Sequence, residues 1–144
     1  MGSGRINVRP IYREGDEYSH PRMITIISAS RCARLYLDDV ELIEQEGRVL
    51  HVVTADRDYT VYESMETVAA MLNTKNFFRP LKSLIVNFDH VRDINDEYIN
   101  FESGQSAAMG RNNISRVRNA FRKYLMNYPA FDPKGAGLRV AEDR

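Results

Sequence analysis

The segment FFRPLKSLIVN, residues 77–87, combines strongly hydrophobic side chains with two basic ones. Five of its residues suit a buried β-strand, namely Phe77, Phe78, Leu84, Ile85 and Val86. A core strand does not need Arg79 and Lys82, and a surface loop does not need the aromatic residues. We therefore predict a segment anchored in a β-rich core that presents Lys82 outward from a loop end.

Upstream of this segment, residues 23–62 consist of short apolar stretches rich in β-branched and aromatic residues. In order, these stretches read MITIISA, ARLYL, VELIEQ, VLHVVTA and DYTVY. Glu46-Gly47 is a natural tight turn between the third and the fourth, and Tyr59 and Val61 alternate with more polar neighbours. The pattern predicts an antiparallel all-β unit.

Two helices are predicted among the strands. In ESMETVAAMLN, Met65, Val68 and Leu72 have helical spacing, and Ser64 stands at the N-cap position. The second helix is NNISRVRNAFRKYLMNY, which Pro129 should end. Its apolar face is predicted to consist of Ile114, Val117, Phe121, Leu125 and Tyr128.

Basic residues flank the apolar face of this second helix. Arg118 and Arg122 fall together on one flank at about 100° per residue, with Arg111 close by if the helix begins early enough. Arg116 and Lys123 fall opposite the apolar face, where we expect solvated side chains. Between the two helices, VRDI, YINFES and QSAAMG are predicted strands, with a hairpin connection at residues 95–97.

The length of 144 residues predicts one domain with tails: a loose polar lead-in over residues 1–21, a domain over 22–128, and a flexible tail over 129–144. No apolar run approaches the roughly 20 residues of a membrane span, and no secretory signal is present. The single cysteine, Cys32, excludes an internal disulfide, which favours the cytoplasm. The three histidines have no metal-ligand spacing, so we expect neither a metal nor a cofactor.

The formal net charge is zero, but the charges are unevenly distributed. Residues 37–46 carry five acids and no base, whereas residues 103–131 carry five bases and no acid. The two runs could be ordinary solvated faces, or the basic run could meet a polyanion. Charge alone leaves both interpretations open.

The order of these pieces resembles the LytTR DNA-binding domain family over roughly residues 23–127. The family's first strand has a D-I-x-x-I-E core, here Asp39 to Glu44. Its signature is close to F-x-R-x-H-x-S-x-I-V-N, and this chain supplies Phe77, Arg79, Ser83, Ile85, Val86 and Asn87. The closing segment of the family, a glycine followed by a basic residue, resembles Gly104 to Arg111. Leu81 departs from the pattern by replacing the usual histidine.

The resemblance implies a mainly β fold of small stacked antiparallel sheets, with one short helix and a C-terminal helix. It also implies a bacterial transcriptional regulator, here expected without a receiver domain, that contacts double-stranded DNA through loops. Position by position, the family's contacts fall on Arg48, Lys82 and Arg111, to which Arg118 and Arg122 could add phosphate contacts. Two copies on direct repeats, as a homodimer or a side-by-side pair, are expected.

Structural roles compete with binding roles for several signature residues. Arg79 is expected to pair with Asp38, Asp39 or Glu44, and Asn87 to satisfy local backbone groups in a turn.

An enzyme is not expected: no catalytic motif is present, and Asp38 and Asp39 adjoin a strand, which would point them to opposite faces.

Two other binding functions remain open. The first is a LytTR-like module that has lost DNA binding and modulates another regulator, a hypothesis favoured by the zero net charge and by Leu81. The second is an RNA-binding β-module. It is weaker because the adjacent Phe77 and Phe78 would alternate between faces instead of forming a stacking platform. The DNA hypothesis requires Arg48, Lys82 and Arg111 to converge on one face.

Overall fold

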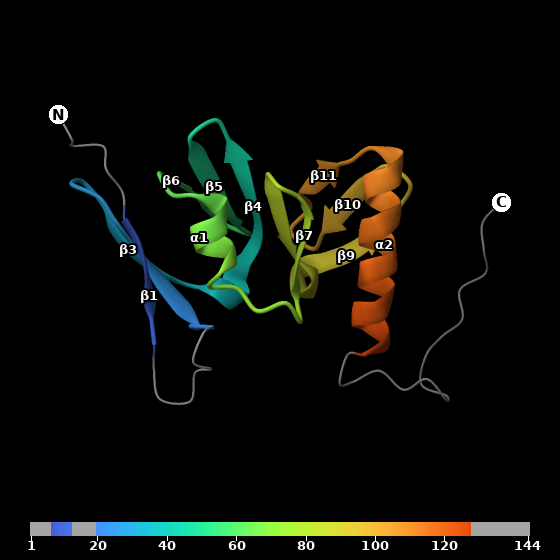
Figure 1. The fold of residues 1–144 in the computed structure, drawn as a ribbon, viewed down its shortest axis with the longest axis horizontal. Coiled ribbons are helices and arrows are strands. Elements are labelled where there is room, and N and C mark those ends of the chain that lie inside the picture. Colours follow the sequence, from blue (N-terminus) through green and yellow to red (C-terminus); the bar gives the residue numbers. More distant parts are fainter. Residues whose placement is uncertain (1–6, 13–19, 128–144) are drawn as a thin grey trace.

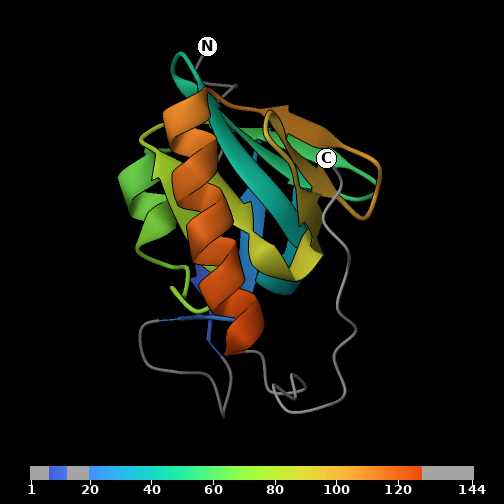
Figure 2. The same cartoon turned by 90° about the vertical axis from the view of Figure 1, so that its right-hand side faces the viewer.

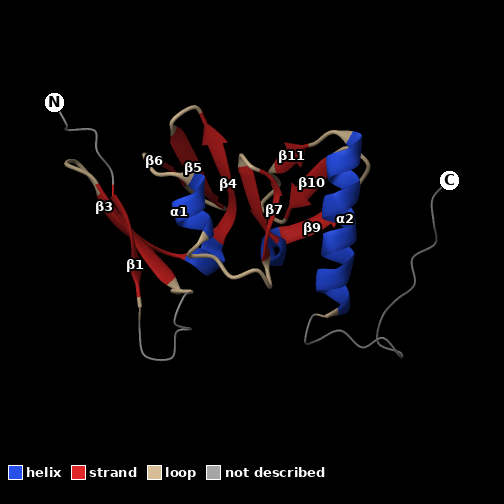
Figure 3. Ribbon diagram, in the orientation of Figure 1, coloured by secondary structure: helices blue, strands red, loops and turns tan. Residues whose placement is uncertain are grey.

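The computed structural model describes residues 7–12 and 20–127 of the chain, and strands dominate this part (Figure 3). Three antiparallel sheets are present within it. The first has the order β1-β2-β3 and consists of β1 (Asn7–Ile11), β2 (Met23–Ile27) and β3 (Cys32–Tyr36). The last has the order β11-β10-β9 and consists of β9 (Val91–Ile94), β10 (Tyr98–Phe101) and β11 (Ser106–Ala108).

A five-stranded sheet lies between these two sheets (Figure 1). Its order is β6-β5-β4-β8-β7, with bounds β4 (Val40–Glu46), β5 (Val49–Thr54), β6 (Asp58–Val61), β7 (Phe77–Leu81) and β8 (Leu84–Asn87). The helices are α1 (Met65–Ala69) and α2 (Arg111–Met126), and two short 3-10 helices, η1 (Leu37–Asp39) and η2 (Phe88–His90), precede β4 and β9. The predicted mainly β fold of small antiparallel sheets is therefore confirmed.

Both faces of the central sheet are covered. One face packs against β1–β3 and α1, in a first cluster that includes Ile24, Leu35 and Met65. The other packs against β9–β11 and α2, in a second cluster that includes Phe101 and Val117. Figure 2 shows α2 running across the outer side of this second layer.

This central position explains why residues 77–87 are so apolar. Phe77 and Ile85 belong to the first cluster, whereas Leu84 and Val86 belong to the second and Phe78 packs against it. Successive residues of a strand point to opposite faces, so a strand between two cores needs apolar residues at every position. The adjacent phenylalanines thus alternate between faces, as predicted.

The prediction of a loose lead-in is wrong for the part of it that the structure describes. β1 pairs antiparallel with β2, from Asn7 opposite Ile27 to Ile11 opposite Met23, and Val8 is buried in the first cluster. Pro10 is compatible with this strand because β1 lies at the edge of its sheet. The strand is short, and it is stabilised by pairing with β2, the next strand along the chain.

The helices match their predicted patterns with limited differences. The Ser64 hydroxyl accepts a hydrogen bond from the backbone N–H of Thr67 at 3.1 Å, which confirms the N-cap. In α2 the predicted residues from Ile114 to Phe121 are buried, but Leu125 is 44% exposed because the last turn extends past the core. Pro129, Tyr128 and the predicted tail lie outside the described residues. No helix in the described part is long and apolar enough to span a membrane.

Candidate nucleic-acid interface

Lys82 is exposed at the tip of the β7–β8 hairpin, as its position in the signature predicts. The strands on either side are fixed by the two cores, and Arg79 fixes the turn itself. The Arg79 guanidinium donates from Nη2 to the Lys82 carbonyl at 2.7 Å and contacts Glu66 Oε2 at 2.9 Å. Lys82 therefore projects from an ordered turn, which lowers the entropy lost on binding.

Arg79 has the structural role that was predicted, but its predicted partner is wrong. It pairs with Glu66 in the first turn of α1 and not with Asp38, Asp39 or Glu44. Glu44 lies on β4, and β8 separates β4 from β7 in the sheet. The hydrogen bond from Arg79 lowers the pKa of Glu66, with smaller contributions from a backbone hydrogen bond and from the charges of Arg79 and Lys82.

Arg48 is exposed in the β4–β5 turn, where Gly47 adopts a positive φ of 61°. This turn lies at the same end of the central sheet as the Lys82 turn. The backbone N–H of Gln45, near the end of β4, donates to the Ser83 carbonyl at 2.8 Å. The bond joins the two hairpin ends directly.

Arg111 is the first residue of α2 and is exposed. The helix is held against β7 by Arg116, whose guanidinium donates to the Pro80 carbonyl and, at 2.9 Å, to Asn113 Oδ1. Arg116 is exposed, as predicted, but its guanidinium also contacts the edge strand β7 that lies beside that flank of α2. The β4–β5 turn, the β7–β8 turn and the start of α2 all lie at the upper end of the molecule in Figure 1.

The two remaining candidate bases on α2 already make contacts within the protein. Arg118 donates from Nη1 to the Asn95 carbonyl at 3.2 Å and lies 3.6 Å from Asp96 Oδ1. Arg122 is exposed and donates to Asn119 Oδ1 at 2.8 Å. Asp96 is fully exposed, so its pairing with Arg118 is weak and a phosphate could compete for the guanidinium.

Asn87 does more than complete a turn. It is fully buried, and its Oδ1 accepts from the Asp89 N–H at 2.9 Å and from Asn76 Nδ2 at 3.1 Å. Its Nδ2 donates to the Val40 carbonyl at 2.9 Å. The signature asparagine thus joins the end of β8 to the start of β4.

The signature residues Asp39, Glu44 and Ser83 are exposed. Asp38 and Asp39 lie in η1 and not on a strand.

One structural residue was missed by the sequence analysis. Glu41 is 1% exposed, and its Oε1 accepts from Ser103 Oγ at 2.9 Å and from Gln105 Nε2 at 2.8 Å. These bonds hold the turn before β11 against β4. The register shift between Val40 and Leu42 makes the burial of Glu41 hard to infer from strand alternation.

The described residues contain no group of three or more side chains suited to a metal ion. Arg48, Lys82 and Arg111 are thus exposed on two turns and a helix start at one end of a mainly β scaffold. The LytTr DNA-binding domain model matches residues 30–122, more than half of the chain. The chain belongs to the LytTR DNA-binding domain family, which is not an enzyme family.

A solved structure supports the fold independently. A LytTr DNA-binding domain from Bacillus cereus superposes with a TM-score of 0.59 at 19% sequence identity, covering 72% of this chain and 96% of that one. At this identity the likeness establishes the fold alone. No curated protein matches the chain.

Proposed function

We propose that this protein is a transcriptional regulator that binds specific double-stranded DNA sequences in the cytoplasm through the loops at one end of its β scaffold. The supporting observation is that the three elements carrying Arg48, Lys82 and Arg111 meet at the same end of the molecule, with all three side chains exposed. Their location at one end would allow them to engage one stretch of duplex together.

The three bases suit different contacts. An arginine can donate two hydrogen bonds to guanine O6 and N7, which discriminates between base pairs by about 1–3 kcal/mol. Arg111 and Arg48 are proposed for this role. Lys82 is a point charge on a rigid turn and suits a phosphate. Arg122, and Arg118 after release from Asp96, would add contacts that set orientation without reading sequence.

Two copies on direct repeats are the proposed functional arrangement. One domain presents few bases at its DNA-binding end, so a second copy would double the number of contacts. The proposal predicts binding sites that contain two similar half-sites in the same orientation.

The experiment is a selection of bound DNA from a random pool, followed by salt titration of the enriched sequence. The wild type is compared with a Lys82→Ala/Arg111→Ala double variant. The matched control is Lys75→Ala/Arg92→Ala, which removes the same charge from two exposed positions. Lys75 precedes β7 and so lies at the opposite end of that strand from Lys82.

We expect one enriched motif, a loss of affinity in the double variant, and near wild-type binding in the control. The slope of log K against log salt should decrease by about 0.9 for each phosphate contact removed. Equal losses in both double variants would show nonspecific charge attraction and contradict the proposed face.

The alternative function is a protein-interaction module that has lost DNA binding. Glu46 lies at the end of β4, beside the Arg48 turn, where its carboxylate would repel a phosphate. Failure to enrich any motif, with weak binding indifferent to all of these substitutions, would favour this alternative.

A further inference from the structure

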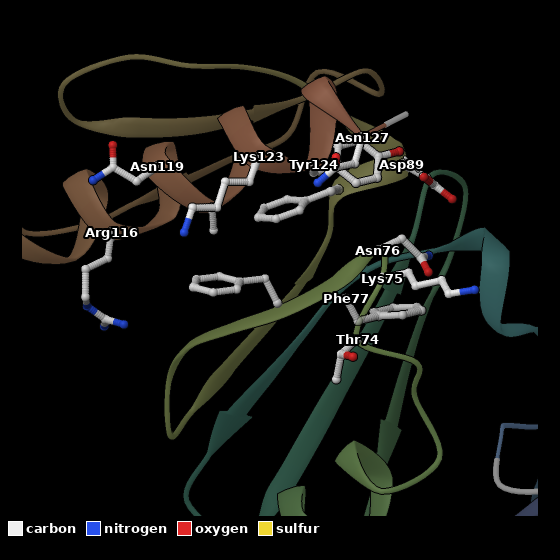
Figure 4. Close-up of a pocket in the computed structure, with 13 residues that line it drawn as sticks. Thr74, Lys75, Asn76, Phe77, Asp89, Arg116, Asn119, Lys123, Tyr124 and Asn127 are labelled. Carbon is white, nitrogen blue, oxygen red and sulfur yellow. Dashed lines mark hydrogen bonds between the residues drawn. The ribbon is translucent and has the colours of Figure 1, made fainter. Parts of the chain in front are cut away.

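A groove separates α2 from the segment that leads into β7 (Figure 4). It has a volume of about 1030 Å³ and lies away from the turns that carry Arg48 and Lys82. Its size is at the upper limit of the roughly 300–1,000 Å³ that are typical of small-molecule sites. Neither the fold nor the proposed DNA contacts require such an open space.

Aromatic rings form the deep wall of this groove. Phe78 and Phe88 stack with their centroids 5.6 Å apart and an interplanar angle of 16°, and Tyr124 packs against Phe88 at 5.5 Å. Phe78 and Tyr124 are only half-buried, so their rings remain available on the groove side. A flat aromatic ligand would extend this series of ring contacts.

The charge of the lining is positive. Lys75, Arg116 and Lys123 contribute three positive charges, and Asp89 contributes one negative charge, which leaves a net charge of +2. The Asp89 carboxylate already accepts a hydrogen bond from the Tyr124 hydroxyl. Among the described residues, the Lys75 and Lys123 ammonium groups make no hydrogen bond or ion pair within the protein.

The cations are placed where they could meet the polar end of such a ligand. In Figure 4, Lys123 extends from α2 toward β7, with Arg116 near one end of the groove and Lys75 near the other. An anion beside the Lys123 ammonium would leave its ring against Phe78 and Phe88.

We propose that this groove is a binding site for a small planar aromatic molecule that carries one anionic group. The ring lies on the wall formed by Phe78, Phe88 and Tyr124, and the anionic group binds Lys123, with Arg116 nearby. An aromatic carboxylic acid and a nucleoside monophosphate both have this chemistry, and the experiment distinguishes them.

The groove has a direct physical connection to the proposed DNA-binding end. Its two walls, α2 and β7, lead to Arg111 and Lys82, and Arg116 bonds α2 to Pro80 between them. A bound ligand that changes the spacing of α2 and β7 would change the spacing of the two bases. This consequence, unlike the site itself, rests on the proposed function.

The site is tested without DNA, by following amide chemical shifts in the full chain during titration with naphthalene-2-carboxylate and, separately, AMP. 2-Naphthylmethylamine is the control that has a similar ring and the opposite charge. We expect saturable shifts confined to residues of the groove and about tenfold weaker binding in Lys123→Glu. Arg92→Glu, an equal charge reversal at an exposed position of β9 outside the groove, should bind as wild type does.

The tighter of the two anions identifies the class of ligand. Equal binding of the amine, or an unchanged affinity in Lys123→Glu, would overturn the site. Lys123 is exposed and unpaired in the described structure, so this variant is expected to remain folded.

The connection to DNA is tested separately with the enriched sequence. Saturating naphthalene-2-carboxylate, or AMP if it binds more tightly, should change the DNA affinity of the wild type several-fold and leave that of Lys123→Glu unchanged. Equal changes in both proteins would contradict the coupling. Ligand binding with no DNA binding at all would contradict the proposed function and leave the site supported.

Discussion

The two sides of the central sheet are packed with different kinds of side chain. The first cluster, beneath β1–β3 and α1, is mainly aliphatic, with methionine, valine, isoleucine and leucine around Phe77 and Tyr59. The second, beneath β9–β11 and α2, contains Phe88, Phe101 and Phe121, with further rings packed against it. The aromatic side also carries the groove and the helix that begins with Arg111.

Directed hydrogen bonds on the two sides position different candidate residues. On the aromatic side, side chains reach across to specific backbone carbonyls: Arg116 to Pro80 and Arg118 to Asn95. Such bonds fix direction, which nonspecific apolar packing does not. On the aliphatic side, Arg79 bonds to Glu66 of α1 and to the Lys82 carbonyl. We infer that the aromatic side positions α2 with Arg111, and that the aliphatic side positions the Lys82 turn.

The largest effect is expected from removing a buried ring on the aromatic side. Phe101 is fully buried, so Phe101→Ala should lower the free energy of unfolding by about 3–5 kcal/mol. The matched change on the aliphatic side is Leu50→Ala, also fully buried, with an expected cost of about 2–5 kcal/mol. Urea unfolding followed by circular dichroism and tyrosine fluorescence measures both.

Both variants should unfold in one transition, because β4 gives Ile43 to the first cluster and Leu42 to the second. A separate early transition in Phe101→Ala would show that the two sides are independent folding units. The aliphatic side and the aromatic side would then be two separately folding domains, and not two parts of one domain.

A smaller effect is expected at the polar junction between the sides. Asn87→Ala removes the donor to the buried Val40 carbonyl and the acceptor for the Asp89 N–H, and should cost about 1–3 kcal/mol. Asn76→Ala is the control because it loses one of the same bonds but leaves the Val40 contact in place. Urea unfolding measures both variants. Equal losses of stability would contradict a stabilising role for the hydrogen bond from Asn87 to the Val40 carbonyl.

On the aliphatic side, removing the N-cap of α1 should lower the free energy of unfolding by about 1 kcal/mol. Ser64→Ala leaves the Thr67 N–H without its side-chain acceptor, whereas Ser64→Asp retains an acceptor. Thermal unfolding should separate the two variants. If Ser64→Asp is destabilised as much as Ser64→Ala, the hydrogen bond of the cap does not stabilise the helix.

Local patterns predicted most of these elements. The N-cap at Ser64, the turn at Gly47 and the buried face from Ile114 to Phe121 each depend on residues close together in sequence. The residue pattern likewise predicted Lys82 at a loop end, which the structure shows to be the tip of the β7–β8 hairpin. These features follow from spacing and residue type, which a sequence displays directly.

Contacts between distant residues could not be read in the same way. The pairing of β1, the burial of Glu41 and the bond from Arg116 to Pro80 all depend on which strands become neighbours. A hydrophobic pattern indicates that a residue faces a core, but it does not identify the residues that pack against it. The predicted partner of Arg79 was wrong for this reason, since Glu66 comes close to Arg79 only after α1 packs beside β7.

The smallest effect concerns the pair formed by Glu66 and Arg79, at the boundary between α1 and the Lys82 turn. The hydrogen bond from Arg79 lowers the pKa of Glu66 below its ordinary value. The stabilisation is therefore fully present above the pKa of Glu66 in the unfolded chain and is lost as the pH falls through the lower pKa of the folded state. In Arg79→Met the pKa of Glu66 should rise toward its ordinary value, as NMR titration of the side-chain carboxyl would measure.

Lys82→Ala provides the graded comparison, because Lys82 is the last of the contributions that lower this pKa. We expect a rise in the pKa of Glu66 in the same direction but smaller than in Arg79→Met. A larger rise in Lys82→Ala would show that the lysine, and not Arg79, controls the carboxylate. Lys82 would then be engaged with Glu66, its ammonium would be less available to a phosphate, and the proposed DNA contact at this turn would lose its physical basis.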